Sequence, residues 1–210
     1  MVNALSRNVT GVLLAGGKSQ RMGGVDKCLL QLGSKRILEY AIERAQPQVD
    51  HLVLNVNGDL RRFSEFKLPM VSDSIAGFAG PLAGVLAGLD WSANNTPNSD
   101  WVVSFAADTP FFPRDLVTRL LNAVDGRGGI LACASSGNRH HPVFGIWPTE
   151  LRGELRRAIV QDDIRRIDIW TSRYDLKVIN YDYEQIDPFF NINNPKDLKL
   201  ASIHVERHAY

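Results

Sequence analysis

The sequence has few of the residues that build cross-linked or zinc-bound folds. It contains 2 cysteines, Cys28 and Cys133, among 210 residues, and its 5 histidines form no cluster with them. This scarcity excludes a disulfide framework and argues against a zinc site. Both cysteines stand beside apolar residues, so we expect them to be small residues of the core.

The chain also lacks an excess of charge of one sign and any long apolar run. It has 24 Lys and Arg against 23 Asp and Glu, a net charge of +1, so there is no global field to attract nucleic acid or an anionic membrane. No segment approaches the length of a membrane span or of a signal peptide, which predicts a cytoplasmic protein. The length and the hydrophobic share of 44% predict one globular domain over residues 1–210.

Two common nucleotide-binding motifs are absent. There is no Gly-x-x-x-x-Gly-Lys-Ser/Thr run and no Gly-x-Gly-x-x-Gly run. The segment Val12–Lys27, "VLLAGGKSQRMGGVDK", instead joins an apolar strand to a loop that holds two glycine pairs, Arg21 and Lys27. Glycines allow backbone N–H groups to approach a ligand, and cations beside them favour phosphate. We therefore predict a phosphate-binding loop, with a flexible surface loop as the alternative.

Apolar runs and helical periodicity alternate along the first two thirds of the chain. Strands are predicted at Val9–Ala15, His51–Val56, Pro69–Asp73, Trp101–Asp108 and 128–135, and helices at Ile37–Ala45, 77–91 and Pro113–Val124. This order predicts the α/β class: an open, mostly parallel, twisted Rossmann-like sheet with helices on both faces. After Ser136 the rhythm changes to a strand (141–147), a helix (149–159), a strand (175–181) and a helix (195–203).

Polar side chains follow three of the predicted strands. Asn55 ends the second strand, Asp73 follows the third and Asp108 follows the fourth. Ligands of open α/β sheets bind outside the carboxyl ends of the strands, so we expect these groups near the phosphate loop. The simpler interpretations are a turn Asn and a helix-capping Asp.

Asp108 and Lys27 are the strongest candidates for chemistry. A carboxylate at the tip of an apolar strand is a suitable Mg²⁺ ligand, because Mg²⁺ is usually held by one or two carboxylates and substrate phosphates. The alternative is that Asp108 stabilises the Thr109-Pro110 turn. Lys27 and Arg21 suit a triphosphate as a point charge and a two-oxygen clamp. The alternative is that both are solvated surface charges.

The segment "LAGGKSQRMGGVDK" resembles the signature loop of the nucleotidyltransferases. The doubled glycine before Val25-Asp26-Lys27 most resembles the molybdenum cofactor guanylyltransferases, and the likeness runs from about Val9 to Leu198. The resemblance implies a nucleotide-diphospho-sugar transferase-like fold. In it, residues 9–110 would bind the nucleotide and residues 137–200 would form the acceptor side.

The resemblance also implies roles for particular residues. Asp108 in "DTP" would be the metal-binding aspartate, and Arg21 and Lys27 would act with it in catalysis. Contacts to the nucleotide and metal would come from Leu14, Ala15, Gly16, Gly17, Lys27, Asn55, Asp73, Gly80, Pro81, Asp108, Asn191 and Asn193.

Some of the segments that match the family also have simpler structural interpretations. Gly80-Pro81 is also good chemistry for a helix start, and Asn194-Pro195 for a helix cap and first turn. Asn191 and Asn193 are two residues apart, so on an extended segment both point the same way. His141, in a segment that matches the acceptor side, is equally suited to packing in a strand.

The activity that the resemblance implies is transfer of GMP from GTP to the phosphate of molybdenum-bearing molybdopterin. The products would be the guanine dinucleotide cofactor and pyrophosphate, with Mg²⁺ as cofactor. The implied partners are the proteins that supply molybdopterin and that mature molybdoenzymes. The alternatives are a cytidylyltransferase for the same pterin, a sugar-1-phosphate nucleotidyltransferase, and a non-catalytic nucleotide-binding protein.

Overall fold

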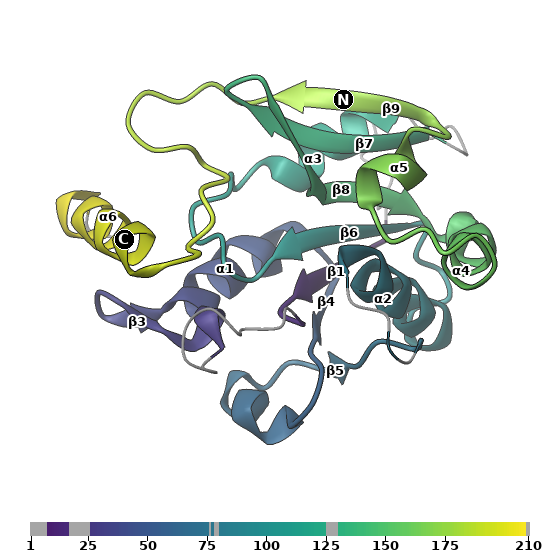
Figure 1. Cartoon of the computed structure of the whole chain (residues 1–210), viewed down its shortest axis with the longest axis horizontal. Coiled ribbons are helices and arrows are strands. Elements are labelled where there is room, and N and C mark those ends of the chain that lie inside the picture. Colours follow the sequence, from purple (N-terminus) through teal and green to yellow (C-terminus); the bar gives the residue numbers. More distant parts are fainter. Residues whose placement is uncertain (1–7, 17–25, 76, 78–79, 125–129, 209–210) are drawn as a thin grey trace, which may run out of the picture.

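The computed structural model describes residues 8–16, 26–75, 77, 80–124 and 130–208. Its main sheet has 7 strands in the order β5-β4-β1-β6-β8-β7-β9 (Figure 1). The strands are β1 (Val9–Leu14), β4 (His51–Asn55), β5 (Met70–Val71), β6 (Trp101–Ala106), β7 (Ile130–Ser136), β8 (Arg139–Pro148) and β9 (Asp175–Asn180). The predicted α/β class with a mostly parallel sheet is confirmed.

One strand runs against the others. β1 is parallel to β4 and β6, β4 to β5, and β7 to β9, whereas β8 is antiparallel to both β6 and β7. All strands except β8 therefore end at the same edge of the sheet. This common carboxyl edge is where ligands of open α/β sheets bind.

The reversal at β8 has a local cause. Two residues, Gly137 and Asn138, connect β7 to β8, and both have positive φ (50° and 62°). Positive φ at both central residues is the requirement of the tight turn that suits a two-residue hairpin. A connection this short cannot cross over to make a parallel pair.

Helices cover both faces of the sheet. α1 (Ile37–Ala45) and α3 (Leu116–Val124) pack on one face, and α2 (Pro81–Asn95), α4 (Arg152–Val160) and α5 (Ile167–Thr171) on the other (Figure 1). Successive strand residues alternate between the two cores, as Val12 and Leu13 do. α2 lies close to β1 because Gly88 has no side chain; a Cβ there would stand 2.8 Å from Val12.

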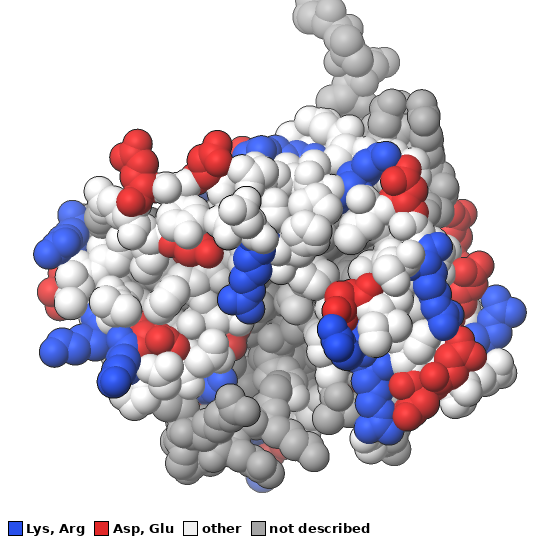
Figure 2. All heavy atoms as spheres, turned by 45° about the horizontal axis from the view of Figure 1, so that its top comes forward, with Lys and Arg blue, Asp and Glu red and all other residues white. Residues whose placement is uncertain are grey.

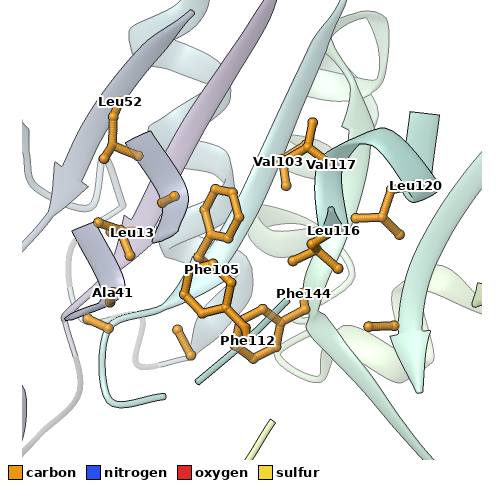
Figure 3. Packing of buried hydrophobic residues seen from close by; sticks show 14 of the residues in the cluster. Leu13, Ala41, Leu52, Val103, Phe105, Phe112, Leu116, Val117, Leu120 and Phe144 are labelled. Carbon is orange, nitrogen blue, oxygen red and sulfur yellow. The ribbon is translucent and has the colours of Figure 1, made fainter. Parts of the chain in front are cut away.

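Aromatic rings fill much of the core on the α1 and α3 side. Phe112 lies between Phe105 and Phe144, with ring centroids 5.2 and 5.5 Å away (Figure 3). Leu116, in the first turn of α3, is in the same cluster and fully buried. Cys28 and Cys133 are buried, as expected of core residues, and burial raises the pKa of the Cys133 thiol to about 11.

A third apolar cluster attaches the C-terminal helix. α6 (Pro195–His208) contributes Ala201 and Val205 to it, and the short hairpin of β2 (Gln31–Leu32) and β3 (Lys35–Arg36) contributes Leu32. Ile192 is buried in the same cluster. The chain before α6 is thereby held against the end of β6.

Several boundaries and elements differ from the prediction. β8 begins at Arg139 instead of 141, α3 begins at Leu116 instead of Pro113, and α6 extends to His208. The 3₁₀ helix η4 (Leu60–Phe66) and α5 were not predicted. In the described part of the chain, no helix is long and apolar enough to cross a membrane.

Candidate nucleotide-binding site

The ends of β4, β1 and β6 lie side by side. Leu14, the last residue of β1, pairs with Asn55 on one side and Ala106 on the other. The pairing continues past the strands, because Ala15 N–H donates to Asn55 C=O (2.9 Å) and Ala107 N–H to Leu14 C=O (3.2 Å). The expected convergence of Leu14, Asn55 and the Asp108 loop at one edge is therefore present.

This pairing limits which backbone groups of Leu14–Gly16 are open to a base. Ala15 N–H and one lone pair of Leu14 C=O already bond within the sheet. A carbonyl has two lone pairs, so Leu14 C=O retains one acceptor position. Ala15 C=O and Gly16 N–H have no bond to another described backbone group. Gly17 lies outside the described residues.

Asn55 and Asp73 belong to one hydrogen-bonded group that also contains Asn57. Asn55 Nδ2 donates to Asp73 Oδ1 (2.9 Å), and Asn57 Nδ2 donates to Asp73 Oδ2 (2.8 Å). Asp73 N–H in turn donates to Asn57 Oδ1 (3.0 Å). Asn57 was not among the predicted site residues, although its spacing of two from Asn55 is the same signal that marked Asn191 and Asn193.

Asn55 is only 2% exposed, so its side chain braces the edge from within. Its Oδ1 would lie 2.5 Å from a Cβ on Gly84 and 3.3 Å from one on Gly16. A side chain at Gly84 would therefore displace Asn55 and, through it, Asp73. Both oxygens of Asp73 accept bonds from amides, so this carboxylate is less available to a metal than that of Asp108.

Asp108 is a largely buried carboxylate at this edge. Burial raises the pKa of the Asp108 carboxyl, against the opposing charge of Lys27, and Thr109 Oγ1 lies 3.5 Å from Asp108 Oδ1. No described lysine or arginine makes an ion pair with it. A carboxylate in this state gains from a bound cation, because a cation offsets the cost of its desolvation.

Lys27 and the two late asparagines meet beside Asp108. Lys27 Nζ donates to Asn193 Oδ1 (3.0 Å), and Thr109 Oγ1 donates to Asn191 Oδ1. Ile192 between them is fully buried, and its N–H donates to Asp108 C=O (3.0 Å). The two asparagines therefore reach toward the same edge, as their spacing indicated.

An arginine that sequence reasoning missed holds the start of the 3₁₀ helix η2 (Lys27–Leu29). Arg62, in η4, is ion-paired with Asp26 and donates to Asn57 C=O (3.2 Å). Asp26 is thus neutralised by Arg62 and not by Lys27. No pattern around Arg62 signals this contact in the sequence, and Arg21 lies outside the described residues.

The remaining predicted residues stand at the start of helices or on the acceptor side. Gly80 is the N-cap of α2 and Pro81 its first residue, as expected from their type. Asn194 Oδ1 accepts from Lys196 N–H (2.9 Å) and Asp197 N–H (3.0 Å), so Asn194 caps α6. His141, near the start of β8, is half-buried and bonds Ser136 (2.7 Å).

The described residues offer one carboxylate for a metal, not a preformed cage. They contain no group of three or more His, Cys, Asp or Glu side chains arranged to hold an ion. An ion that keeps water and substrate phosphates as ligands suits such a site. Basic and acidic side chains are mixed over the face shown in Figure 2. Attraction of an anion must therefore come from particular residues.

Known proteins resemble this chain in sequence and in fold. A family model described as the MobA-like NTP transferase domain matches residues 11–174. The molybdenum cofactor guanylyltransferase of Nitrobacter hamburgensis is 52% identical over 191 residues, covering 91% of each chain. That of Mesorhizobium japonicum is 47% identical over 201 residues, covering 94% of this chain and 96% of its own.

Solved structures support the fold. The molybdopterin-guanine dinucleotide biosynthesis protein A of Archaeoglobus fulgidus has a TM-score of 0.71 at 24% identity, covering 94% of this chain and 99% of its own. The 4-diphosphocytidyl-2C-methyl-D-erythritol synthase of Anaerococcus prevotii has a TM-score of 0.73 at 13% identity, covering 96% and 97%. Enzymes of such nucleotidyltransferase families typically use a divalent metal. On the sequence matches, the chain belongs to the molybdenum cofactor guanylyltransferase family and carries a MobA-like NTP transferase domain.

Proposed function

We propose that this protein transfers GMP from GTP to the terminal phosphate of a molybdopterin-type pterin. An oxygen of the acceptor phosphate attacks the α-phosphorus of GTP, a new P–O–P linkage forms, and the bond to the β-phosphate breaks to release pyrophosphate. The acceptor is already an anionic nucleophile, so no side chain has to form a covalent intermediate. Catalysis then rests on positioning and on neutralising negative charge.

One observation carries the proposal: Asp108, Lys27, Asn191 and Asn193 meet at the end of the strand next to β1. Lys27 offers its charge to the triphosphate, and Asn193 Oδ1 orients its ammonium group. Asp108 would hold Mg²⁺, and the ion would supply positive charge to offset the negative charge of the phosphates. Arg21 is proposed as a second phosphate contact on the resemblance alone.

The guanine base is proposed to bind the open backbone positions of Leu14–Gly16. Gly16 N–H would donate to guanine O6, and Ala15 C=O would accept from the N–H groups of the pyrimidine edge. Asn55 and Asp73 support this edge from behind. Gly84 of α2 lies against Leu14 and Asn55, so the N-terminus of α2 at Gly80 and Pro81, which favours anions, would lie near the phosphates of the nucleotide. We thus assign residues 9–110 to the nucleotide and residues 137–200 to the acceptor.

A titration of the purified protein with each of the four nucleoside triphosphates and Mg²⁺ tests the choice of base. GTP should bind more tightly than ATP, because adenine has an amino donor where guanine has O6 and lacks the N1 proton. Each unpaired buried group costs about 1–3 kcal/mol. A preference for CTP would move the assignment to the cytidylyl enzymes of the same pterin, and the absence of nucleotide binding would contradict the proposal.

The chemistry of the acceptor also points to partners. A pterin that bears a phosphate and a metal must be delivered by the proteins that make it and passed to enzymes that use it. Both kinds of protein are proposed as partners of this chain, on the resemblance. Co-purification of the tagged full-length chain with either kind, against a tag-only control, tests this.

A further inference from the structure

Three polar residues on the acceptor side form a hydrogen-bonded cluster that the nucleotide site does not use. Ser136 Oγ lies 2.7 Å from His141 Nε2 and 2.7 Å from Asp187 Oδ1. Ser136 is the last residue of β7, His141 is near the start of β8, and Asp187 follows β9. The cluster therefore joins three strands at one point of the carboxyl edge.

The protons of this cluster can be assigned by counting. The single hydroxyl proton of Ser136 goes to the carboxylate of Asp187, which can only accept. His141 Nε2 must then carry a proton and donate it to Ser136 Oγ. The other ring nitrogen of neutral His141, Nδ1, is left as an acceptor. Burial lowers the pKa of His141, while the negative charge of Asp187 acts in the opposite direction. The lowered pKa favours the neutral form of His141 at pH 7.

Asp187 also has one carboxylate oxygen, Oδ2, that is open to a ligand. Its Oδ1 takes bonds from Ser136 Oγ and from Phe189 N–H (2.8 Å). No described residue donates to Oδ2 by a side-chain or backbone hydrogen bond. The His141 ring is fixed as well, stacked on Phe189 at a centroid distance of 4.7 Å and an interplanar angle of 25°.

The three residue types match those of a serine hydrolase, but the arrangement does not. In a nucleophilic triad the histidine accepts the serine proton and the carboxylate bonds the other histidine nitrogen. Here Ser136 gives its proton to Asp187 and is 1% exposed, so it cannot attack a substrate. The cluster presents acceptors and holds them rigidly, as a binding subsite requires.

The distance from the nucleotide site suggests what the subsite binds. Val103 of β6 and Ala132 of β7 both pair with Ile146 of β8, so the two strands are in register. β6 ends at Ala106, two residues before Asp108, and Ser136 is the last residue of β7, so both residues lie at the carboxyl edge. β8 lies between β6 and β7, so the two strands are two strand spacings apart where they pair with it, about 10 Å. The segment between β9 and α6 runs along this edge (Figure 1).

We propose that Asp187 Oδ2 and His141 Nδ1 bind the amino-pyrimidinone ring of the acceptor pterin while its phosphate lies beside Asp108 and Lys27. A pterin ring carries a ring N–H next to an exocyclic amino group, so its edge is made of donors that match two acceptors. The phosphate and the donor edge of the ring lie at opposite ends of the acceptor. The Asp108–Lys27 region and the Ser136–His141–Asp187 cluster are likewise at separate points along the carboxyl edge of the sheet. The negative charge of Asp187 also suits the amino end and would repel the phosphate end.

An exposed aromatic ring stands next to the subsite. Tyr183 is 46% exposed, and its Oη would lie 2.9 Å from a Cβ on Gly137, the residue after Ser136. An aromatic face at this position offers a stacking surface for a planar heterocycle. Ser136 acts as a positioning residue, because its hydroxyl bonds both His141 and Asp187 and is itself buried.

This inference rests on the proposed function, so the test must separate the two. Wild-type enzyme, Asp187→Asn and His141→Gln are assayed for transfer from GTP to purified molybdopterin, with GTP affinity and Tm measured alongside. In Asp187→Asn, Oδ1 still accepts from Ser136 and an amide donor replaces the open Oδ2 acceptor. In His141→Gln, the side-chain amide replaces the Nε2–H donor to Ser136, and no acceptor stands at the position of Nδ1. We expect KM for molybdopterin to rise about tenfold or more, with kcat, GTP affinity and Tm nearly unchanged. Asp175→Asn, at the opposite end of β9, is the matched control and should behave as wild type.

Competition by small pterins sharpens the result. Pterin (2-amino-4-oxopteridine) should inhibit the wild type more strongly than lumazine, which has an oxygen in place of the amino group, and Asp187→Asn should lose this preference. An unchanged KM in both variants, or equal inhibition by the two compounds, would overturn the inference. So would a joint fall in Tm and GTP affinity, which would mean that the cluster only braces Asn191 and Asn193. Absence of transfer by the wild type would instead contradict the proposed function.

Discussion

Two pairs of asparagines, each spaced by two residues, stand at the carboxyl edge and have different roles. Asn55 and Asn57, at the end of β4, direct both of their amides to Asp73, and Asn55 is buried. Asn191 and Asn193, before α6, are exposed and bond Thr109 and Lys27 beside Asp108. The first pair holds the edge together, while the second surrounds the groups that would meet phosphate and metal.

The comparison shows that spacing alone does not give a residue its role. Alternation on an extended segment places both members of each pair on one side. Burial then decides between the two roles, because a buried amide must be paired within the protein, whereas an exposed amide can exchange its partner for a ligand. Substitutions in the two regions should therefore separate stability from activity.

The largest expected effect belongs to Asp108. Asp108→Asn should reduce guanylyl transfer more than about 100-fold, because removing the charge that holds a metal costs several kcal/mol of transition-state stabilisation. Burial disfavours the charged form of Asp108, so a neutral amide of the same size should leave Tm unchanged or higher. Steady-state rates and thermal unfolding in metal-free buffer measure both. A rate above a tenth of wild type would mean that another carboxylate, with Asp73 as the first candidate, holds the ion.

Lys27→Ala should have the next largest effect. The charge of Lys27 would face the triphosphate in the ground state and in the transition state, so both GTP affinity and rate should fall. The combined loss of transition-state stabilisation should be about 2–3 kcal/mol. Lys35→Ala is the control, since Lys35 is ion-paired with Glu43 in the β3–α1 region. Calorimetric titration with GTP decides the question. Unchanged affinity with a lower Tm would show that Lys27 is structural.

Asn55→Ala tests the buried pair. The substitution leaves Asp73 Oδ1 without its amide donor, which should cost about 2 kcal/mol of stability. For a chain of this size the loss lowers Tm by about 4–8 °C. Asn191→Ala, the exposed counterpart, should leave Tm close to wild type. If the two substitutions lowered Tm equally, the distinction between the pairs would be wrong.

Asn193→Ala should give the smallest effect and only on activity. Loss of one exposed hydrogen bond to Lys27 should lower kcat/KM for GTP, which corresponds to a loss of about 1 kcal/mol of transition-state stabilisation. Tm should not change. The double variant with Lys27→Ala should be no worse than Lys27→Ala alone, because the two residues act together. Full additivity in this cycle would show that Asn193 contacts the substrate independently of Lys27.

The sequence predicted elements best where local signals were strong. α1 has the predicted bounds Ile37–Ala45, since five apolar positions at helical spacing precede Pro47. α5 was missed because five residues are too few to show a period, although Trp170 buries it firmly. The antiparallel direction of β8 was not predicted, yet Gly137-Asn138 is a two-residue hairpin signal.

The positions of the candidate site residues were predictable where polar residues directly follow a strand. Asp108 and Asn55 stand out against the apolar runs that precede them, and the sheet brings them to one edge. Arg62 reaches Asp26 across 36 residues, and Asp187 reaches Ser136 across 51, through contacts that only the tertiary fold creates. Neither residue has a local pattern from which its partner could be inferred.

Formation of the dinucleotide tests the proposed activity most directly. Purified protein is incubated with Mg²⁺, molybdopterin and either GTP or CTP, and the products are identified by mass spectrometry together with released pyrophosphate. We predict a guanine dinucleotide of the pterin, equimolar pyrophosphate, and formation of both more than about 100-fold slower with Asp108→Asn. A cytosine dinucleotide formed in preference, or pyrophosphate release that does not depend on the pterin, would contradict the proposal.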